Sequence, residues 1–326
     1  MLGWDDLKPQ IAVSDSTVEC PVRNCAQRVK RQSKTFRRQN EFLCPVHQIY
    51  ISPSTFEHVD YRENLIWASE EDRRLLDAIA SEKRESRMAR ERSEDAVTWN
   101  VFRFLERHKL LGKFIAIADG GRRPSAEPSV VYWSYCQRVC GAAVCLSTAS
   151  KAFGEKPKRG SEPDVILETP EVLVFVEAKL GSGNKTTPSD PSRRDRYVIG
   201  GNGWHSSVFL PGSTFDVVAV EEEKYELLRL WLLGTWSAAQ TGKRFVLVNL
   251  LRDGVVNEAD IEQRFGRHIQ SDDRRSFVRT TWEQVNDEIV AKQADSPDRN
   301  RMLRFFEKKT LGYAGRFHRL QKAFTV

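Results

Sequence analysis

Apolar and polar positions recur at near-helical spacing through residues 62–111, where Leu65, Leu75, Leu76 and Ile79 mark one apolar face. This spacing predicts helix, with "SEKRESRMARERSED" as a charged, solvated stretch inside it. A second apolar face follows in "AVTWNVFRFLERHKLL". We expect further helix in the apolar residues 130–150 and again in the tail from Asp298. Residues 181–215 are rich in Gly, Ser, Pro and Arg and predict a long loop.

Short apolar runs predict strands around 164–168, 172–180, 214–220 ("TFDVVAV") and 243–251 ("KRFVLVNLL"). The stretch "EEEKYELLRLWLLGTWSAAQ" predicts a helix between the last two runs, and "RSFVRTTWEQV" predicts a strand that turns into helix. The resulting order is helix, strand, strand, loop, strand, helix, strand. It indicates an α/β or α+β domain, with a mixed central sheet flanked by helices, rather than regular βαβ alternation.

A length of 326 residues suits one large domain or a core with a small module, and 40% hydrophobic content predicts a packed core. We divide the chain into a turn-rich module over residues 1–60 and a helical segment with the core domain over residues 61–326. No apolar run approaches the roughly 18–20 residues that span a bilayer. The start, "MLGWDDLKPQ", lacks the features of a secretory signal. We therefore expect a cytoplasmic protein that does not associate with membranes.

Two charged residues interrupt the apolar run "VLVFVEAKL" at residues 172–180. Side chains alternate across a strand, so Glu177 and Lys179 share one face with Phe175. Burying a charge without a partner costs several kcal/mol or more, and packing alone rarely justifies that cost twice in one strand. The pair is therefore a candidate functional feature.

Asp164 opens the preceding run and supplies a second carboxylate. If Pro170 and Glu171 are the central residues of the turn, Asp164 lies directly opposite Glu177; a turn one residue earlier makes them diagonal neighbours. Both registers keep the two within about 5–8 Å. Two carboxylates this close need a cation between them, and oxygen ligands suit Mg²⁺ or Mn²⁺. A structural ion pair between Asp164 and Lys179 is the alternative.

The order Pro163-Asp164 … Glu177-Ala178-Lys179 resembles the signature of the PD-(D/E)XK nuclease superfamily. The resemblance covers roughly residues 93–251 and includes the helical carboxylate that many members carry upstream, here Glu94 in "SEDAVTWNVFRFLE". That segment is also similar to restriction-endonuclease-like bacterial proteins with a helical E-D-x-x-T-W-N motif. Asp95 is the alternative carboxylate. Both acids also suit a structural role at the start of a helix that Ser93 caps.

The resemblance implies a restriction-endonuclease-like core and a set of roles. Asp164 and Glu177 would bind one or two Mg²⁺ ions with the Ala178 carbonyl, and Glu94 would assist through metal or water. Lys179 would orient or activate the attacking water and offset phosphate charge. Such a metal lowers the pKa of its bound water and neutralises charge on the scissile phosphate. The implied reaction is hydrolysis of DNA, in restriction or phage defence, with RNA the less expected substrate.

The N-terminal cysteines follow a second pattern, Cys20-x4-Cys25-x18-Cys44-x2-His47. Two close pairs joined by a longer loop are what a tetrahedral Zn²⁺ site needs, so we predict zinc at these four residues. Few apolar residues lie between the pairs, so the module is expected to need its metal to fold. Free thiols are the alternative. The cluster Cys136, Cys140 and Cys145 lies in an apolar setting without a histidine, and we expect buried thiols there.

A formal net charge of +6 and a pI of about 9.0 favour an anionic partner. From Cys20 to Asn40 the chain carries seven basic residues and no acidic one, which fits a contact with a phosphate backbone. The candidate nucleic-acid-binding residues are Arg28, Arg31, Lys34, Arg37 and Arg38, with Lys185 and Arg196 as weaker candidates in the loop after Lys179. A solvated basic surface is the alternative.

Two other functions stay open. One is a zinc-containing nucleic-acid-binding protein whose nuclease-like core is inactive, and the other is a nuclease that acts on RNA. The pair of carboxylates favours the enzyme, because a pure binder needs no acids that face a polyanion. The sequence leaves the oligomeric state open, a homodimer included.

Overall fold

The computed structural model describes residues 1–33, 35–82, 87–133, 142–155, 162–181, 183–190, 194–253 and 261–326. The chain divides into two compact units. Unit 1 comprises residues 1–76, 84–104 and 282–326, and unit 2 comprises residues 77–83 and 105–281. The two units are described in turn.

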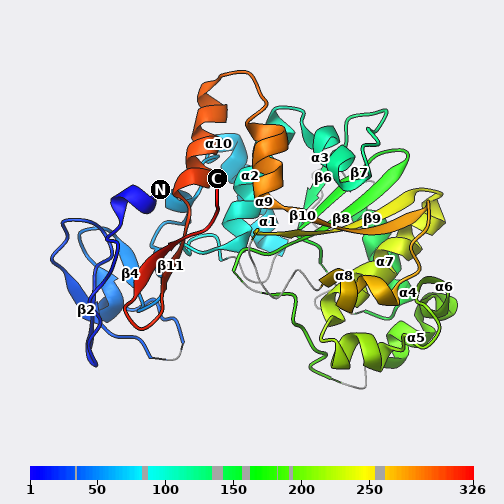
Figure 1. The fold of residues 1–326 in the computed structure, drawn as a ribbon, viewed down its shortest axis with the longest axis horizontal. Coiled ribbons are helices and arrows are strands. Elements are labelled where there is room, and N and C mark those ends of the chain that lie inside the picture. Colours follow the sequence, from blue (N-terminus) through cyan, green and yellow to red (C-terminus); the bar gives the residue numbers. More distant parts are fainter. Residues whose placement is uncertain are drawn as a thin grey trace. The chain divides into compact units, whose positions relative to one another are not determined.

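Unit 2 is built on a five-stranded sheet with the order β10-β9-β8-β7-β6 (Figure 1). Its strands are β6 (Ser129–Tyr132), β7 (Val165–Glu168), β8 (Val172–Ala178), β9 (Arg244–Leu251) and β10 (Arg275–Thr281). β6, β7 and β8 pair antiparallel, whereas β8, β9 and β10 pair parallel. The predicted mixed central sheet is confirmed, and so are the strands predicted around 164–168, 172–180 and 243–251.

Helices cover both faces of this sheet (Figure 1). They are α3 (Leu111–Ala118), α4 (Ala142–Ala152), α5 (Arg194–Gly203), α6 (His205–Val208), α7 (Tyr225–Thr241) and α8 (Ile261–Arg264). α4 and α7 share one face, where α7 buries an almost continuous apolar stripe. The helix ends where Gly242 takes a φ of 69°, a left-handed cap that glycine adopts without steric cost. The predicted helix over 221–240 is thus confirmed.

An apolar row crosses the sheet beneath α7, and it consists of Val131, Ile166, Phe175, Leu247 and Phe277. Each residue stands beside the next in the strand register, so together they form one line of the core. The next row on the same face, toward the carboxyl ends of β8, β9 and β10, is polar and contains Glu177, Asn249 and Arg279. That change from apolar to polar positions the candidate site.

Three element predictions were wrong, one of them in part. The expected strand at 214–220 is a π-helical turn, Asp216–Glu221. Phe215, Val218 and Ala219 are buried there at helical spacing, a period that an apolar run this short conceals. The expected loop over 181–215 contains α5 and α6. The helix expected over 130–150 is confirmed in part, by α4 from Ala142 onward, and wrong at its start, which belongs to strand β6.

Unit 1 combines three small sheets with helices. Its strands are β1 (Thr17–Glu19), β2 (Arg28–Lys30), β3 (Leu43–Cys44), β4 (Ile49–Ile51), β5 (Phe56–His58), β11 (Thr310–Ala314) and β12 (Arg319–Lys322). Its helices are α9 (Trp282–Val285), α10 (Pro297–Lys308) and most of α1 (Glu70–Glu82) and α2 (Glu94–Arg107). The helices predicted within 62–111 and in the tail are therefore present. α10 begins where the Arg299 N–H donates to the Ser296 hydroxyl (3.2 Å), an N-cap.

Acid should weaken unit 1 through His58 of β5. Its side chain is buried, and burial together with the nearby Lys309 ammonium lowers its pKa to about 4. The unfolded chain, with a histidine pKa of about 6.5, takes up the proton first, so stability is lost as the pH falls from about 6.5 toward 4. The loss should reach about 2 kcal/mol at pH 5.

Melting temperatures at pH 7 and pH 5 test this for the parent and for His58→Gln. The melting temperature of the parent should fall more on acidification than that of His58→Gln, because only the parent carries the buried imidazole. His108→Gln, which removes an exposed histidine, is the matched control and should behave like the parent. Equal losses in the parent and in His58→Gln would contradict the assignment.

Candidate functional site

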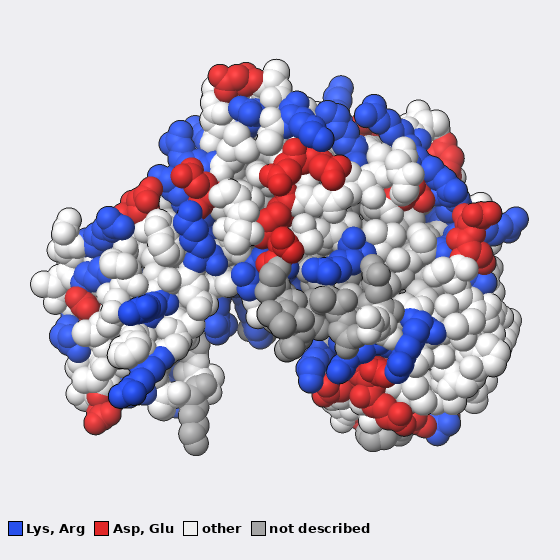
Figure 2. All heavy atoms as spheres, in the orientation of Figure 1, with Lys and Arg blue, Asp and Glu red and all other residues white. Residues whose placement is uncertain are grey.

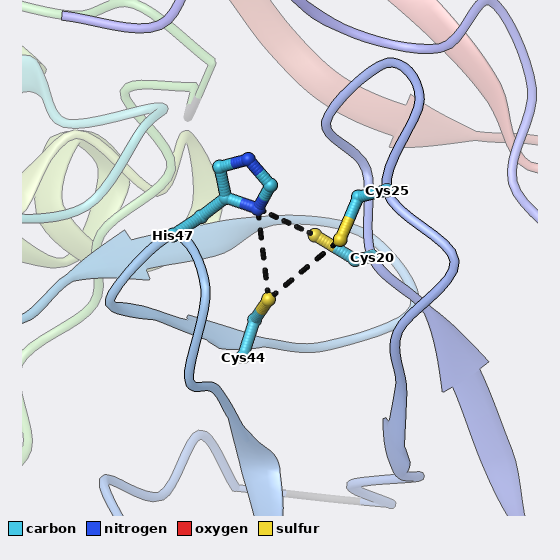
Figure 3. A group of neighbouring side chains, drawn as sticks. All are labelled: Cys20, Cys25, Cys44 and His47. Atoms are coloured by element: carbon cyan, nitrogen blue, oxygen red, sulfur yellow. Dashed lines mark hydrogen bonds between the residues drawn. The ribbon is translucent and has the colours of Figure 1, made fainter.

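Four predicted zinc ligands of unit 1 come together on two turns (Figure 3). Cys20 follows β1, and the turn that leads to Cys25 closes with a hydrogen bond from the Cys25 N–H to the Val22 carbonyl (3.2 Å). Cys44 ends β3, and the Gln48 N–H closes the second turn onto the Cys44 carbonyl (2.9 Å). Asn24 and Gln48 take positive φ values of 60° and 51°, which bend the backbone at each turn.

Three distances among the four ligand atoms agree with those of a tetrahedral metal site. His47 Nδ1 lies 3.7 Å from Cys20 Sγ and 3.6 Å from Cys44 Sγ, and Cys25 Sγ lies 3.9 Å from Cys44 Sγ. A tetrahedral Zn²⁺ with usual bond lengths places sulfur about 3.8 Å from sulfur and about 3.6 Å from nitrogen. Among the described residues, this is the one group of three or more Cys, His, Asp or Glu ligand atoms that all lie within 4.8 Å of one another.

The surroundings suit a metal more than free thiols. The three cysteines are buried, and burial raises the pKa of the Cys20 thiol, which the Val22 N–H partly offsets by donating to the sulfur. A bound cation would stabilise the thiolates that burial disfavours. The group sits within one apolar cluster, which includes Leu7, Val18, Ile49, Ile51, Phe56, Tyr313 and Leu320. The four residues thus form a buried Cys₃His group that could hold a metal ion such as zinc.

A second group lies in unit 2, in the polar row of the sheet. The β7–β8 register ends with the pair Val165 and Val176, and the Asp164 N–H also donates to the Val176 carbonyl (3.0 Å), so Asp164 lies at the end of the pairing beside the stretch that contains Glu177. The Thr169 N–H donates to the Val172 carbonyl (2.9 Å), leaving Pro170 and Glu171 as the central turn residues. This is the first of the two predicted turn positions, and a direct pairing of Asp164 with Glu177 stays a prediction.

The same row continues across the parallel strands. Glu177 pairs with Asn249 of β9, and Asn249 pairs with Arg279 of β10. Polar residues at the carboxyl ends of parallel strands lie where α/β sheets bind ligands. The Asn249 amide exchanges hydrogen bonds of 3.1 and 2.9 Å with the buried Asn184 amide, and it approaches the Glu177 carbonyl at 3.4 Å.

Both carboxylate oxygens of Asp164 accept hydrogen bonds. The Ala178 N–H donates to Oδ2 (2.9 Å), and the Trp133 indole N–H donates to Oδ1 (3.1 Å). These two bonds fix the orientation of the carboxylate. Of Ala178, the structure describes the backbone N–H in this contact; its carbonyl as a metal ligand stays a prediction.

Glu177 and Lys179 form a buried ion pair that Glu226 of α7 joins. The Lys179 ammonium contacts Glu177 directly and lies 3.3 Å from Glu226, and the exposed fractions of the Lys179 and Glu177 side chains are only 13% and 3%. Glu226 is in the first turn of α7, whose N–H groups the Thr186 hydroxyl and carbonyl help to satisfy. The ionic pairing of Lys179 is therefore with Glu177 and Glu226, which differs from the simple Asp164–Lys179 pair weighed above.

Burial and neighbouring charges shift the pKa values of Lys179 and Glu177. Burial by itself would lower the pKa of Lys179, but Glu177, Glu226 and Asp164 together raise it well above its usual range. Burial raises the pKa of Glu177 well above normal, and the carboxylates of Glu226 and Asp164 add to this against the opposing effect of Lys179. Lys179 is therefore the member of the group that is firmly charged at neutral pH.

Sequence reasoning missed Trp133, Glu226 and Asn249. Asn249 carried a usable signal, since it is the one polar residue in "FVLVNLL", just as Glu177 and Lys179 interrupt their own strand. Trp133 and Glu226 carried none, because only the fold brings them to the row.

Glu94 lies in unit 1, as the first residue of α2. The Ser93 hydroxyl accepts a hydrogen bond from the Ala96 N–H (3.0 Å), so the expected cap is confirmed. The Asp95 carboxylate accepts from the Arg87 N–H (3.2 Å). A capped first turn is a structural reason for both acids, and the catalytic role of Glu94 stays a prediction.

The candidate nucleic-acid-binding residues fall into several environments. Arg28, Arg31, Arg37 and Arg38 are exposed, and basic side chains are scattered over the visible face around β2 and β4 (Figure 2). Arg31 lies 3.8 Å from Asp15, and Arg38 pairs with the buried Glu57, which gives Arg38 a structural role.

In unit 2, Lys185 pairs with Glu223 at 2.9 Å, and Arg196 is half-buried in α5. Lys34, Cys136 and Cys140 lie outside the described residues, as does the side chain of Cys145.

Comparison with known proteins adds no family: no family model, no curated protein and no solved structure matches this chain. In the part of the chain that the structure describes, no helix has both the length and the apolar composition to cross a membrane. The functional argument therefore stands on the two groups described above.

Proposed function

We propose that this protein is a metal-dependent endonuclease that hydrolyses phosphodiester bonds of DNA, with an N-terminal zinc centre. The observation that carries the proposal is the polar end of β8, where Asp164 accepts a hydrogen bond from the Ala178 N–H between the paired Glu177 and Lys179. Polar and charged residues replace the core side chains there, at the end of a sheet where ligands commonly bind. The resemblance of these residues to the PD-(D/E)XK signature supports the same reading.

The donor set fits Mg²⁺ or Mn²⁺. Mg²⁺ is commonly bound through one or two carboxylates, with water and substrate phosphates as the other ligands, and Asp164 and Glu177 are the two that would hold it. Burial is the main cause of the raised pKa of Glu177, and a bound divalent cation would favour the ionised form that burial disfavours. When bound, the metal supplies a water of lowered pKa and neutralises phosphate charge.

The protein's own residues orient the Asp164 carboxylate and supply a hydrogen-bond donor. Trp133 and the Ala178 N–H hold the Asp164 carboxylate in one orientation. Lys179 is an ammonium at neutral pH, so it donates to the attacking water or to a phosphate oxygen rather than removing a proton. Its contact with Glu226 keeps the ammonium beside the row.

A second candidate function is nucleic-acid binding by a core that does not cleave. The observation in its favour is the ion-pair network itself, since the Lys179 ammonium contacts the carboxylates of Glu177 and Glu226. In that case the acids of the row are structural partners of a buried lysine.

Incubation of the purified protein with supercoiled plasmid and with an RNA of similar length, each with and without added Mg²⁺, separates these functions. We expect nicked or linear plasmid only with Mg²⁺, and little change in the RNA. Magnesium should be omitted rather than chelated, because a chelator would also remove zinc. An intact plasmid with both Mg²⁺ and Mn²⁺ would favour the binding protein, and cleavage of RNA alone would make the substrate RNA.

A further inference from the structure

Two segments of the chain are basic and free of acidic residues. Residues 20–40 carry seven Lys and Arg without an Asp or Glu. Residues 308–326 form the second segment, which carries five Lys and Arg, one His and again no acid. This second segment includes the hairpin of β11 and β12.

Unit 1 joins the two segments through one set of backbone contacts. The Leu320 N–H donates to the Pro9 carbonyl (3.0 Å), and the Ile11 N–H donates to the His318 carbonyl (3.3 Å). From there the pairing passes through Val13 and Val18 into β1 and on to β2, which carries Arg28. The hairpin therefore belongs to the same strip of paired backbone as the N-terminal basic segment, and Figure 1 draws β11 beside β4.

The hairpin is held firmly at its base. Tyr313 and Leu320 are buried in the apolar cluster that surrounds Cys20 and Cys44, and the Tyr313 N–H donates to the Ser54 carbonyl (2.8 Å). Lys309, just before β11, is fully buried and donates to the Asn64 side chain (3.1 Å). A rigid base makes the tip a fixed projection.

The tip presents an aromatic ring between basic groups. The side chain of Phe317 is 57% exposed, and the guanidinium groups of Arg316 and Arg319 lie 5.8 and 5.6 Å from its ring centroid. Gly315 and His318 take positive φ values of 72° and 47°, so the tight turn directs Phe317 away from the core. A single exposed apolar residue needs no explanation, but a ring bracketed by arginines on an acid-free hairpin does.

We propose that the β11–β12 tip is a nucleic-acid contact, in which Phe317 stacks on a base and Arg316 and Arg319 bind the flanking phosphates. Every base offers a π face to an aromatic side chain, and the planar guanidinium suits phosphate oxygens. The inference rests on the proposed function only in taking nucleic acid as the ligand. Single-stranded DNA and an opened step of a duplex present the same chemistry, and the experiment separates them.

Binding of a fluorescein-labelled 30-nucleotide strand and of its duplex, followed by anisotropy over a salt series without added magnesium, tests the proposal. Phe317→Leu should weaken binding by at least about 5-fold with an unchanged salt slope, whereas Phe317→Trp should keep parental affinity. Arg316→Gln/Arg319→Gln should reduce the slope by about 1.8 on duplex or about 1.4 on single strand. Arg301→Gln/Arg304→Gln removes two exposed charges of α10 and is the matched control, expected to change the slope less.

If Phe317→Leu loses more affinity for the single strand than for the duplex, the stacked base is an unpaired one. The reverse result would assign the stacked base to an opened step of the duplex. The proposal is overturned if the parent binds neither ligand, if Phe317→Leu binds like the parent, or if both double variants reduce the slope equally. Binding is measured without cleavage, so a chain that never cuts DNA can still confirm this contact. Conversely, if the parent cuts DNA and Phe317→Leu binds as tightly as the parent, the proposed contact is wrong and the proposed nuclease activity stands.

Discussion

Replacement of Lys179 by methionine is expected to lower DNA cleavage by at least about 100-fold while the protein stays folded and still binds Mg²⁺. Positioned proton donors contribute factors of about 10²–10⁴ to such reactions, and methionine fills the space without the ammonium. Asp164→Asn should abolish cleavage and also weaken Mg²⁺ binding, because it removes the charge of a metal ligand. Cleavage rates, metal titration and melting curves of the three proteins measure these effects.

The other end of the same sheet offers a matched control. Lys243 pairs there with Glu168, and its side chain is 16% exposed, close to the 13% of Lys179. Lys243→Met should therefore cost stability as Lys179→Met does, since each leaves a carboxylate without its cation, but it should not slow cleavage. Parental cleavage by a folded Lys179→Met would show that this strand is not a nuclease site. Activity that falls in step with stability in both variants would show a structural ion pair.

Loss of the zinc centre is expected to unfold the N-terminal part of unit 1. Purified protein should contain about one zinc per chain, and Cys20→Ser/Cys44→Ser should contain none. Structural zinc contributes about 10–16 kcal/mol in small zinc-binding peptides, as much as the whole stability of a typical domain. Here the metal would also support the cluster in which Tyr313 and Leu320 pack, so the C-terminal hairpin should loosen as well.

Elemental analysis and hydrogen exchange of the two hairpin strands measure these outcomes. Cys136→Ser/Cys140→Ser is the control, since it removes two cysteines from the sequence "CQRVCGAAVC", which contains no histidine, and should leave the zinc content unchanged. Full zinc content in Cys20→Ser/Cys44→Ser would place the metal elsewhere. If the variant holds no metal but its hairpin strands exchange hydrogen as slowly as those of the parent, the metal does not stabilise the module.

The helix predictions show where local pattern suffices. α7 and α10 were predicted closely because long apolar stripes and caps are local signals. The turn at 214–220 was mistaken for a strand because seven apolar-rich residues satisfy either period. Burial of Phe215 against α7 and the sheet, which decides between them, depends on residues far away in the chain.

The sequence by itself determined the two candidate groups. The Cys20–His47 spacing specifies two ligand turns, and Pro170 with Glu171 forms the turn that brings Asp164 near Glu177. Both are short-range features, in which few bonds separate the residues that must meet.

Only the tertiary structure decided the partners from elsewhere in the chain. Trp133 reaches Asp164 through β6, and Glu226 reaches Lys179 through α7. The β11–β12 hairpin reaches the apolar cluster around Cys20 and Cys44 from the far end of the sequence. The physical reason is that such contacts depend on how strands order and helices pack once the core is buried. That choice is made by the summed burial of many apolar residues, which no local spacing records.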